Sequence, residues 1–162
     1  MSKYFILDEL HVYRQQLLLR LEQIPAGYES ALRTAVEADI HPQMLTLNWS
    51  LHQHLAHVRD AEKILFLPAI QRILDEEKPR LAEFDHKEWM ATHYQAEELF
   101  ENILQEIAIL HRRFTQTLDD MAANGWSRPG RHPRLGLRTL QWWVERCLAH
   151  AEEHLTQIKE LI

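Results

Sequence analysis

Histidine is the residue type that sets this chain apart, because 11 of its 162 residues are histidines. Two of them, His150 and His154, are four residues apart near the C-terminus. On an α-helix this spacing places both imidazoles on one face, one turn apart, where two ring nitrogens can bind the same divalent cation. Trp143 and Cys147 share that face, which predicts that the pair points into a protein core. By itself such a pair is more often structural, either bonded to carboxylates in a core or exposed on a solvated face.

A metal site of this kind needs a third ligand, and residues 51–62 (LHQHLAHVRDAE) offer candidates. His54 and His57 are three residues apart and can share a helical face. His52 points elsewhere on the same helix. The spacing alone does not choose between His54 and His57.

Long helices are the elements that would position these histidines. Apolar residues recur at helical spacing from Leu7 to Leu21, and the first helix is expected to end at the sequence IPAG, residues 24–27. A weaker helical segment is expected to follow, as far as about Ala38.

A second long helix is expected from Leu51 to about Glu77, with Ser50 and Gln53 forming a capping box at its start. Pro68 interrupts its pattern and predicts a kink or a local irregularity.

The rest of the chain repeats the helical pattern. A short helix is expected around His86–Trp89, a third long helix over Tyr94–Ala122, a loop over 125–136 and a fourth long helix over Leu137–Leu161. The third helix is expected to face the core with Leu99, Ile103, Ile107, Leu110, Phe114, Leu118 and Met121. No segment alternates like a strand. We therefore predict an all-α protein, with residues 1–162 forming a single antiparallel four-helix bundle.

Composition excludes several classes of protein. Eighteen basic residues against 24 acidic ones give a net charge of −6, which argues against a nucleic-acid partner. One cysteine excludes an intrachain disulfide and a Cys-rich zinc module, and it favours the reducing cytoplasm. No apolar run approaches the 18 residues or so that would span a membrane, so no membrane partner is expected.

Three segments together resemble the DinB-like family of metal-binding four-helix bundles. They are Trp49-Ser50 followed by LAHVRDAE (55–62), the run WSRPGRHPRLGLRTL (126–140) and the run HAEEHLTQI (150–158). Their order and separation match the family, and the resemblance covers nearly the whole chain.

The resemblance implies one divalent metal ion, nickel or zinc, held by His57, His150 and His154, with His54 as the rival third ligand. It also implies an enzyme that transfers or isomerises a small-molecule substrate with a low-molecular-weight thiol. The alternatives are a non-catalytic metal-binding stress or sensor protein and a structural bundle without metal. The family tendency and the adjacent Trp142 and Trp143 predict a homodimer.

Other polar residues are assigned around this site. Asp60, one turn after His57, is a candidate acceptor that orients a ligand imidazole, whereas Glu153 is interpreted as a surface carboxylate. Cys147 is interpreted as a small core residue. His132 either contacts the site or substrate, with Arg128 and Arg131 as further candidates, or packs beside Pro133. The remaining single histidines are interpreted as surface or boundary residues: His11, His41, His86, His93 and His111.

Overall fold

The computed structural model describes residues 3–40, 49–119 and 121–162, with side chains from residue 6 onward. Three single helices contribute to a bundle, namely α1 (Lys3–Glu37), α5 (Phe100–Asp119) and α6 (Leu140–Lys159). The fourth rod is continuous through α2 (Leu51–Ala61), the π-helix η1 (Glu62–Phe66) and α3 (Leu67–Asp75). A short outer helix α4 (His86–His93), a 3-10 turn η2 (Gly125–Ser127) and the strands β1 (Pro129–His132) and β2 (Gly136–Thr139) complete the fold.

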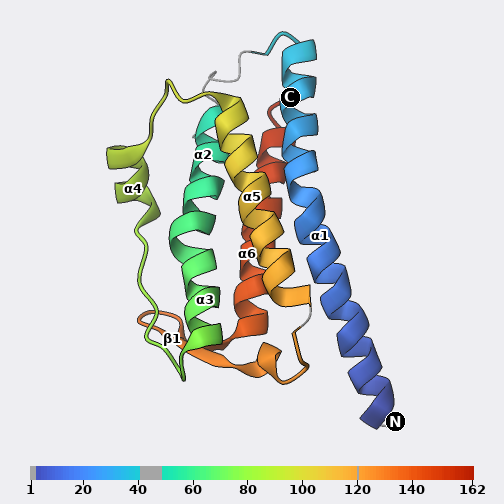
Figure 1. Cartoon of the computed structure of the whole chain (residues 1–162). Helices are drawn as coiled ribbons and strands as arrows, with labels where there is room; N and C mark the ends of the chain where they lie inside the picture. The colour runs from blue at the N-terminus through green and yellow to red at the C-terminus, as the bar shows by residue number, and fades with distance from the viewer. Residues whose placement is uncertain (1–2, 41–48, 120) are drawn as a thin grey trace.

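The predicted all-α four-helix bundle is confirmed, and its helices run up, down, down and up in chain order (Figure 1). Because the α2–α3 rod and α5 run in the same direction, the chain between them returns along the outside of the bundle through α4 (Figure 1). Both α1 and the α2–α3 rod pack against α5 and α6. The α2–α3 rod is therefore antiparallel to α6, which brings residues 51–62 alongside the C-terminal histidine pair.

The prediction that the first helix ends at IPAG is wrong, because α1 continues through Pro25 and Gly27. Pro25 has no N–H to give to the carbonyl of Leu21, four residues earlier. The buried imidazole of His111, on α5, donates from Nδ1 to that carbonyl at 2.7 Å. Gly27 permits close packing on α6, since a β-carbon here would lie 2.7 Å from Cδ2 of Leu155. Both residues therefore serve the packing of α1 rather than its termination.

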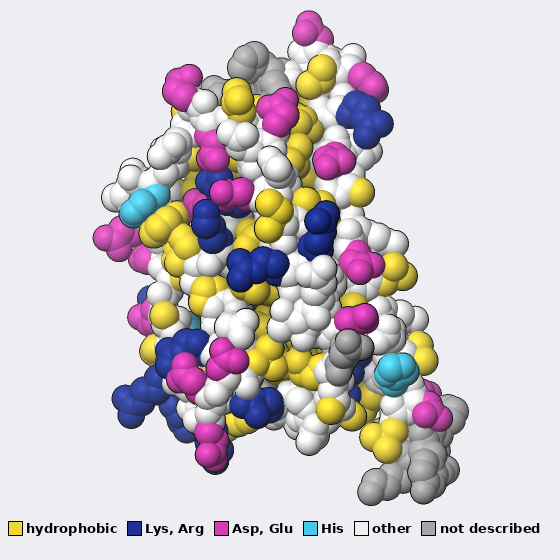
Figure 2. All heavy atoms as spheres, in the orientation of Figure 1, with side chains coloured by type: hydrophobic (Ala, Val, Ile, Leu, Met, Phe, Trp, Pro, Cys, Tyr) yellow, Lys and Arg dark blue, Asp and Glu magenta, His cyan; other side chains and the backbone are white. Residues whose placement is uncertain are grey.

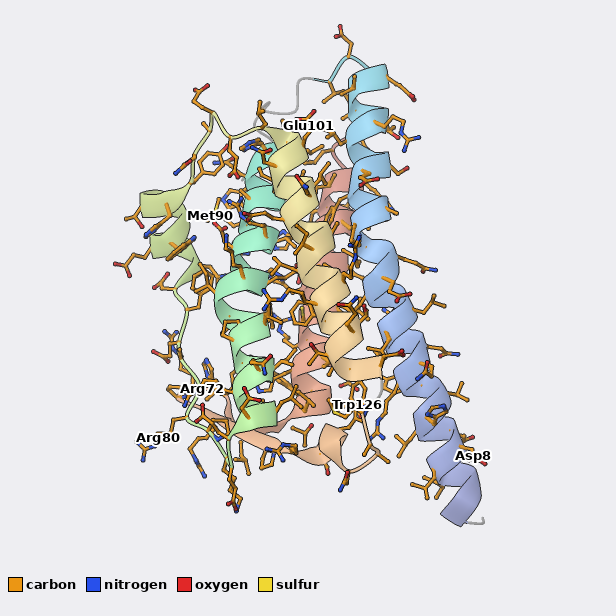
Figure 3. All side chains as sticks on the ribbon, viewed as in Figure 1. Asp8, Arg72, Arg80, Met90, Glu101 and Trp126 are labelled. Carbon is orange, nitrogen blue, oxygen red and sulfur yellow. The ribbon has the colours of Figure 1, made fainter. Side chains whose placement is uncertain are left out.

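The buried face of α1 also begins later than the apolar spacing predicted. The part of the helix that carries Asp8 extends beyond the other helices (Figure 3). Leu7 is 48% exposed there, whereas Leu17 and Leu21 are buried farther along. An apolar stripe shows which face of a helix could pack, but here the first turns of α1 have no helix beside them.

The α2–α3 rod follows the prediction at both of its marked positions. Ser50 and Gln53 form the capping box, with Gln53 N donating to Ser50 Oγ at 3.1 Å and Ser50 N donating to Gln53 Oε1 at 2.8 Å. Pro68 is the second residue of α3, and the turn just before it is the π-helix η1. The irregularity predicted at Pro68 is thus a widened helical turn, a feature often found at functional sites.

The third helix is shorter than predicted and begins at Phe100, which leaves Leu99 63% exposed. Ile103, Ile107 and Phe114 are buried as predicted. The predicted absence of strands is wrong, because β1 and β2 pair as an antiparallel hairpin with His132 opposite Gly136. Four-residue strands are too short to show a convincing alternation in sequence. Within the described residues, no helix is both long and apolar enough to cross a membrane.

Candidate metal centre

Three histidines from two helices converge inside the bundle. His57 lies on α2 and His150 and His154 lie on α6, and one ring nitrogen of each lies within 4.8 Å of those of the other two. The Nε2 atoms of His57 and His150 are 3.1 Å apart. Two nitrogens bound tetrahedrally to one zinc ion lie about 3.3 Å apart, given zinc–nitrogen bonds of about 2.0–2.1 Å. The separation of the two imidazoles therefore suits a shared ion, and all three side chains are at most 9% exposed.

His54 lies beside this group and makes a different contact. Its Nδ1 is 2.8 Å from Nδ1 of His154, so one of these nitrogens donates a hydrogen bond to the other. Such a hydrogen bond fixes the orientation of the His154 ring, as outer partners of metal ligands commonly do. The structure thus brings His57 together with the His150 and His154 pair, and it places His54 behind His154. His52 points away, as predicted, with its ring nitrogens 2.8 Å from Tyr94 Oη and 2.8 Å from the Glu98 carbonyl.

Burial keeps these imidazoles neutral. It lowers the pKa of His57 to about 3 and that of His150 to about 2, and the charges of neighbouring histidines add to the effect. Burial is also the main cause that lowers the pKa of His54 and His154 to about 4. Neutral imidazole is the form that binds metal, so the cluster needs to lose no proton at neutral pH to accept an ion.

The same pKa shifts predict that the metal-free protein loses stability in mild acid. A histidine in an unfolded chain has a pKa of about 6.5, whereas these four stay neutral in the folded chain well below that pH. The unfolded state therefore binds more protons. The stability that these groups contribute is present above pH 6.5 and is lost as the pH falls toward the folded pKa, by up to about 1.4 kcal/mol per pH unit for each histidine.

We expect His54→Gln to reduce this loss by up to about 1.4 kcal/mol per pH unit, measured by urea unfolding of the metal-free protein between about pH 7 and pH 5. His11→Gln is the control, because His11 is exposed on α1 and changes its surroundings little on unfolding. The same dependence on pH in the wild type and in His54→Gln would contradict the prediction.

The residues predicted to support the ligands have other partners. Asp60 accepts from Arg59 Nε at 2.6 Å and from Trp89 Nε1 at 2.9 Å, so it holds α4 against α2 and orients no imidazole of the described residues. Glu153 is exposed and Cys147 is buried, both as predicted. Burial raises the pKa of the Cys147 thiol well above its usual value, and the charge of Glu62 adds to this, which keeps the thiol protonated.

Of the histidines interpreted as surface or boundary residues, His111 is in the core instead, whereas His86 lies at the boundary. His111 is 1% exposed, and its Nε2 lies 2.8 Å from the buried carboxylate of Glu62. Burial alone would lower the pKa of His111, but the charge and hydrogen bond of Glu62 outweigh it and raise the pKa. His86 is half-buried, with its ring centroid 4.9 Å from that of His57. Neither residue has another histidine at metal-ligand spacing in the sequence, so only the fold shows where its side chain lies. His11 and His93 are exposed as predicted, and His41 lies outside the described residues.

A cavity of about 250 Å³ adjoins the cluster at His150. Residues from η1, the segment before α4, the start of α4, the hairpin and α6 form its walls, including Phe66, His86, His132, Trp142, Trp143 and Arg146. His132 therefore lies in the wall of the cavity that adjoins the cluster, and its contact with substrate stays a prediction. Arg128 instead donates to the carbonyls of Ile73 and Glu76, and Arg131 is not part of the walls, so neither supports the role predicted for it. Arg146 also lines the cavity, and it was not predicted from the sequence although it precedes His150 by one helical turn.

The fold is a four-helix bundle in which three histidines could hold a metal ion, and comparison with known proteins places the chain in a family. The chain belongs to the DinB superfamily, whose family model matches residues 9–158.

Two sequence relatives carry the name "Putative metal-dependent hydrolase". The protein from Oceanobacillus iheyensis is 26% identical over 113 residues, which is 70% of this chain but only 64% of the relative. The protein from Bacillus pumilus is 26% identical over 145 residues, 88% of this chain and 81% of the relative.

A solved structure supports the fold. YfiT from Bacillus subtilis, described as a probable metal-dependent hydrolase with an unusual four-helix bundle topology, superposes with a TM-score of 0.80 at 21% identity. The match covers 99% of this chain and 87% of YfiT.

Proposed function

We propose that this chain is a divalent-metal-dependent enzyme in which His57, His150 and His154 hold the metal ion. The observation that carries the proposal is the convergence of three buried, neutral imidazoles next to a cavity. Imidazole nitrogens suit borderline cations, which favours zinc or nickel over magnesium or calcium. An ion held by three protein ligands keeps positions open, and it lowers the pKa of a water or thiol bound there.

Two nucleophiles fit such a site. Water would make the chain a hydrolase, and the names of both sequence relatives support this choice. A low-molecular-weight thiol would make it a transferase or an isomerase. The cavity wall supports this second choice, because Phe66, Trp142 and Trp143 offer aromatic rings with which sulfur makes favourable contacts.

Either nucleophile must give up a proton, and His86 is placed to accept it. His86 lines the cavity, and its ring centroid lies 4.9 Å from that of His57 and 6.0 Å from that of His150. Its buried Nδ1 has no hydrogen-bond partner among the described residues. Burial is the main cause that lowers its pKa, so the ring is neutral and can act as a base at neutral pH.

We expect His86→Gln to lower kcat by about a hundredfold or more, the usual effect of removing a general base, while the metal content stays unchanged. His93→Gln is the matched control, because His93 is exposed at the other end of the same short helix. A variant that loses its metal together with its activity would show that His86 supports the site instead of moving a proton.

The decisive experiment first measures bound metal in the purified, untagged chain, and then assays ester and amide hydrolysis and thiol transfer from several thiols. Hydrolysis that requires His150 supports the hydrolase, and thiol transfer that requires it supports the transferase. One bound ion without turnover would favour the sensor or stress protein, and a chain without metal would favour a structural bundle. A cytoplasmic location and a homodimer remain predictions that accompany this proposal.

A further inference from the structure

We infer that the cavity beside His150 binds a small apolar acid through its single carboxylate, with Arg146 as the anchoring cation. The inference rests on the proposed function in one respect, because it takes this cavity to be the place where substrate reaches the metal cluster. It adds the chemical class of that substrate and the residue that recognises its charge.

Arg146 is a solvent-exposed positive charge in the cavity wall. It lies on α6 one turn before His150, and it forms no hydrogen bond or ion pair with any described residue. Arg134, in the same wall, is already neutralised by Glu83 at 2.7 Å. A planar guanidinium with free donors is the side chain best suited to hold a carboxylate by two parallel hydrogen bonds.

A further group in the walls is left as a donor. The backbone N–H groups of Arg134 and Leu135 both donate to Nδ1 of His132 at 3.2 Å. Nδ1 must therefore carry a lone pair, which places the proton of the neutral ring on Nε2 as a donor. A ligand that supplies acceptor oxygens would suit this N–H and the guanidinium of Arg146.

The size and the remaining walls restrict the ligand further. A volume of about 250 Å³ lies just below the usual range for ligand pockets, which indicates a small molecule. Leu65, Phe66 and Trp142 give the cavity apolar surface for the rest of the ligand. Arg134 and Glu83 in the walls neutralise each other, which leaves Arg146 as the lining cation without an ion-pair partner among the described residues. One carboxylate on a small apolar body therefore fits better than a dianion such as a phosphate ester.

The charge around the cavity favours the approach of an anion. Although the whole chain has a net charge of −6, residues 125–146 contain five arginines and a single acidic residue, Glu145. Figure 2 shows several basic side chains, with acidic ones among them, at the end of the molecule where Arg72 and Arg80 are labelled in Figure 3 and the hairpin is seen in Figure 1. A local positive field of this kind raises the concentration of anions near a cleft.

The test uses phenylacetate and its neutral amide, phenylacetamide, as probes of equal shape. Binding to the full-length chain is measured by isothermal titration and by tryptophan fluorescence, both as purified and after removal of metal with a chelator. We expect phenylacetate to bind at least about tenfold more tightly than the amide, and Arg146→Gln to remove at least about tenfold of that affinity. Arg146→Lys should restore part of it, and His132→Gln should weaken binding less than Arg146→Gln does.

Arg112→Gln is the control, because it removes the same charge from an exposed position on α5 outside the cavity. Equal affinity for acid and amide, an equal loss in Arg112→Gln and Arg146→Gln, or no binding of phenylacetate up to about 10 mM would each overturn the inference. The binding measurement on the metal-free chain tests the carboxylate inference separately from the proposed function. Carboxylate binding that depends on Arg146 in a chain without metal leaves the inference standing, whereas a missing metal refutes only the metal-dependent enzyme.

Discussion

Replacing His57 by alanine is expected to abolish stoichiometric metal binding, whereas replacing His54 by alanine should leave one ion bound per chain. His57 offers a nitrogen to the point where those of His150 and His154 converge. His54 instead hydrogen-bonds the ring of His154 and can influence an ion only by orienting that ring. Loss of an outer partner costs about 10–100-fold in metal affinity, and loss of one of three ligands should cost more.

The measurement is metal content after dialysis, followed by competition against a chelator of known affinity. A His150→Ala, His154→Ala double variant is the reference for a chain without the site. Metal retained in that double variant would refute the site as a whole. Loss of metal in His54→Ala with retention in His57→Ala would instead show that His54, and not His57, is the metal ligand from α2.

The sequence predicts the pair of histidines on α6, because these two residues lie one helical turn apart. His150 and His154 share a face of α6 because of their spacing alone. The choice between His54 and His57 depends on how α2 is rotated against α6, which no local spacing encodes. His86 and Arg146 join the site through the cavity, and that cavity exists only once η1, the hairpin and α6 are packed together.

The fold shows the same division between local and distant causes. The capping box at Ser50 depends on neighbouring residues, and the sequence predicts it. A helix end near Ala38 is also found as predicted, but it is the end of α1 and not of a separate segment. The continuation of α1 through Pro25 depends on His111, which is 86 positions away along the chain and fills the hydrogen-bonding gap at Leu21. A proline is judged a helix breaker because its missing N–H leaves a carbonyl without a partner, and here a distant side chain supplies that partner.

This arrangement leads to a second large expected effect, in which His111→Leu destabilises the protein by about 3–5 kcal/mol. The imidazole donates to the Leu21 carbonyl and faces the Glu62 carboxylate. The other carboxylate oxygen, Oε2, is buried and already has no hydrogen-bond partner among the described residues. Removing the imidazole therefore leaves a buried charge without its counterion and a buried carbonyl without its donor.

Two second-site changes should each recover part of the stability that His111→Leu removes. The quantity measured is the free energy of unfolding in urea. Pro25→Ala returns a backbone N–H to the Leu21 carbonyl, so it should recover about 1–2 kcal/mol in the His111→Leu chain and much less in the wild type. Glu62→Leu removes the unpaired charge, so the His111→Leu, Glu62→Leu chain should be more stable than His111→Leu alone. If Pro25→Ala has the same effect in both backgrounds, the carbonyl of Leu21 does not depend on His111.

Because η1 begins at Glu62 and carries Phe66 into the cavity wall, the His111→Leu chain should also bind a cavity ligand more weakly.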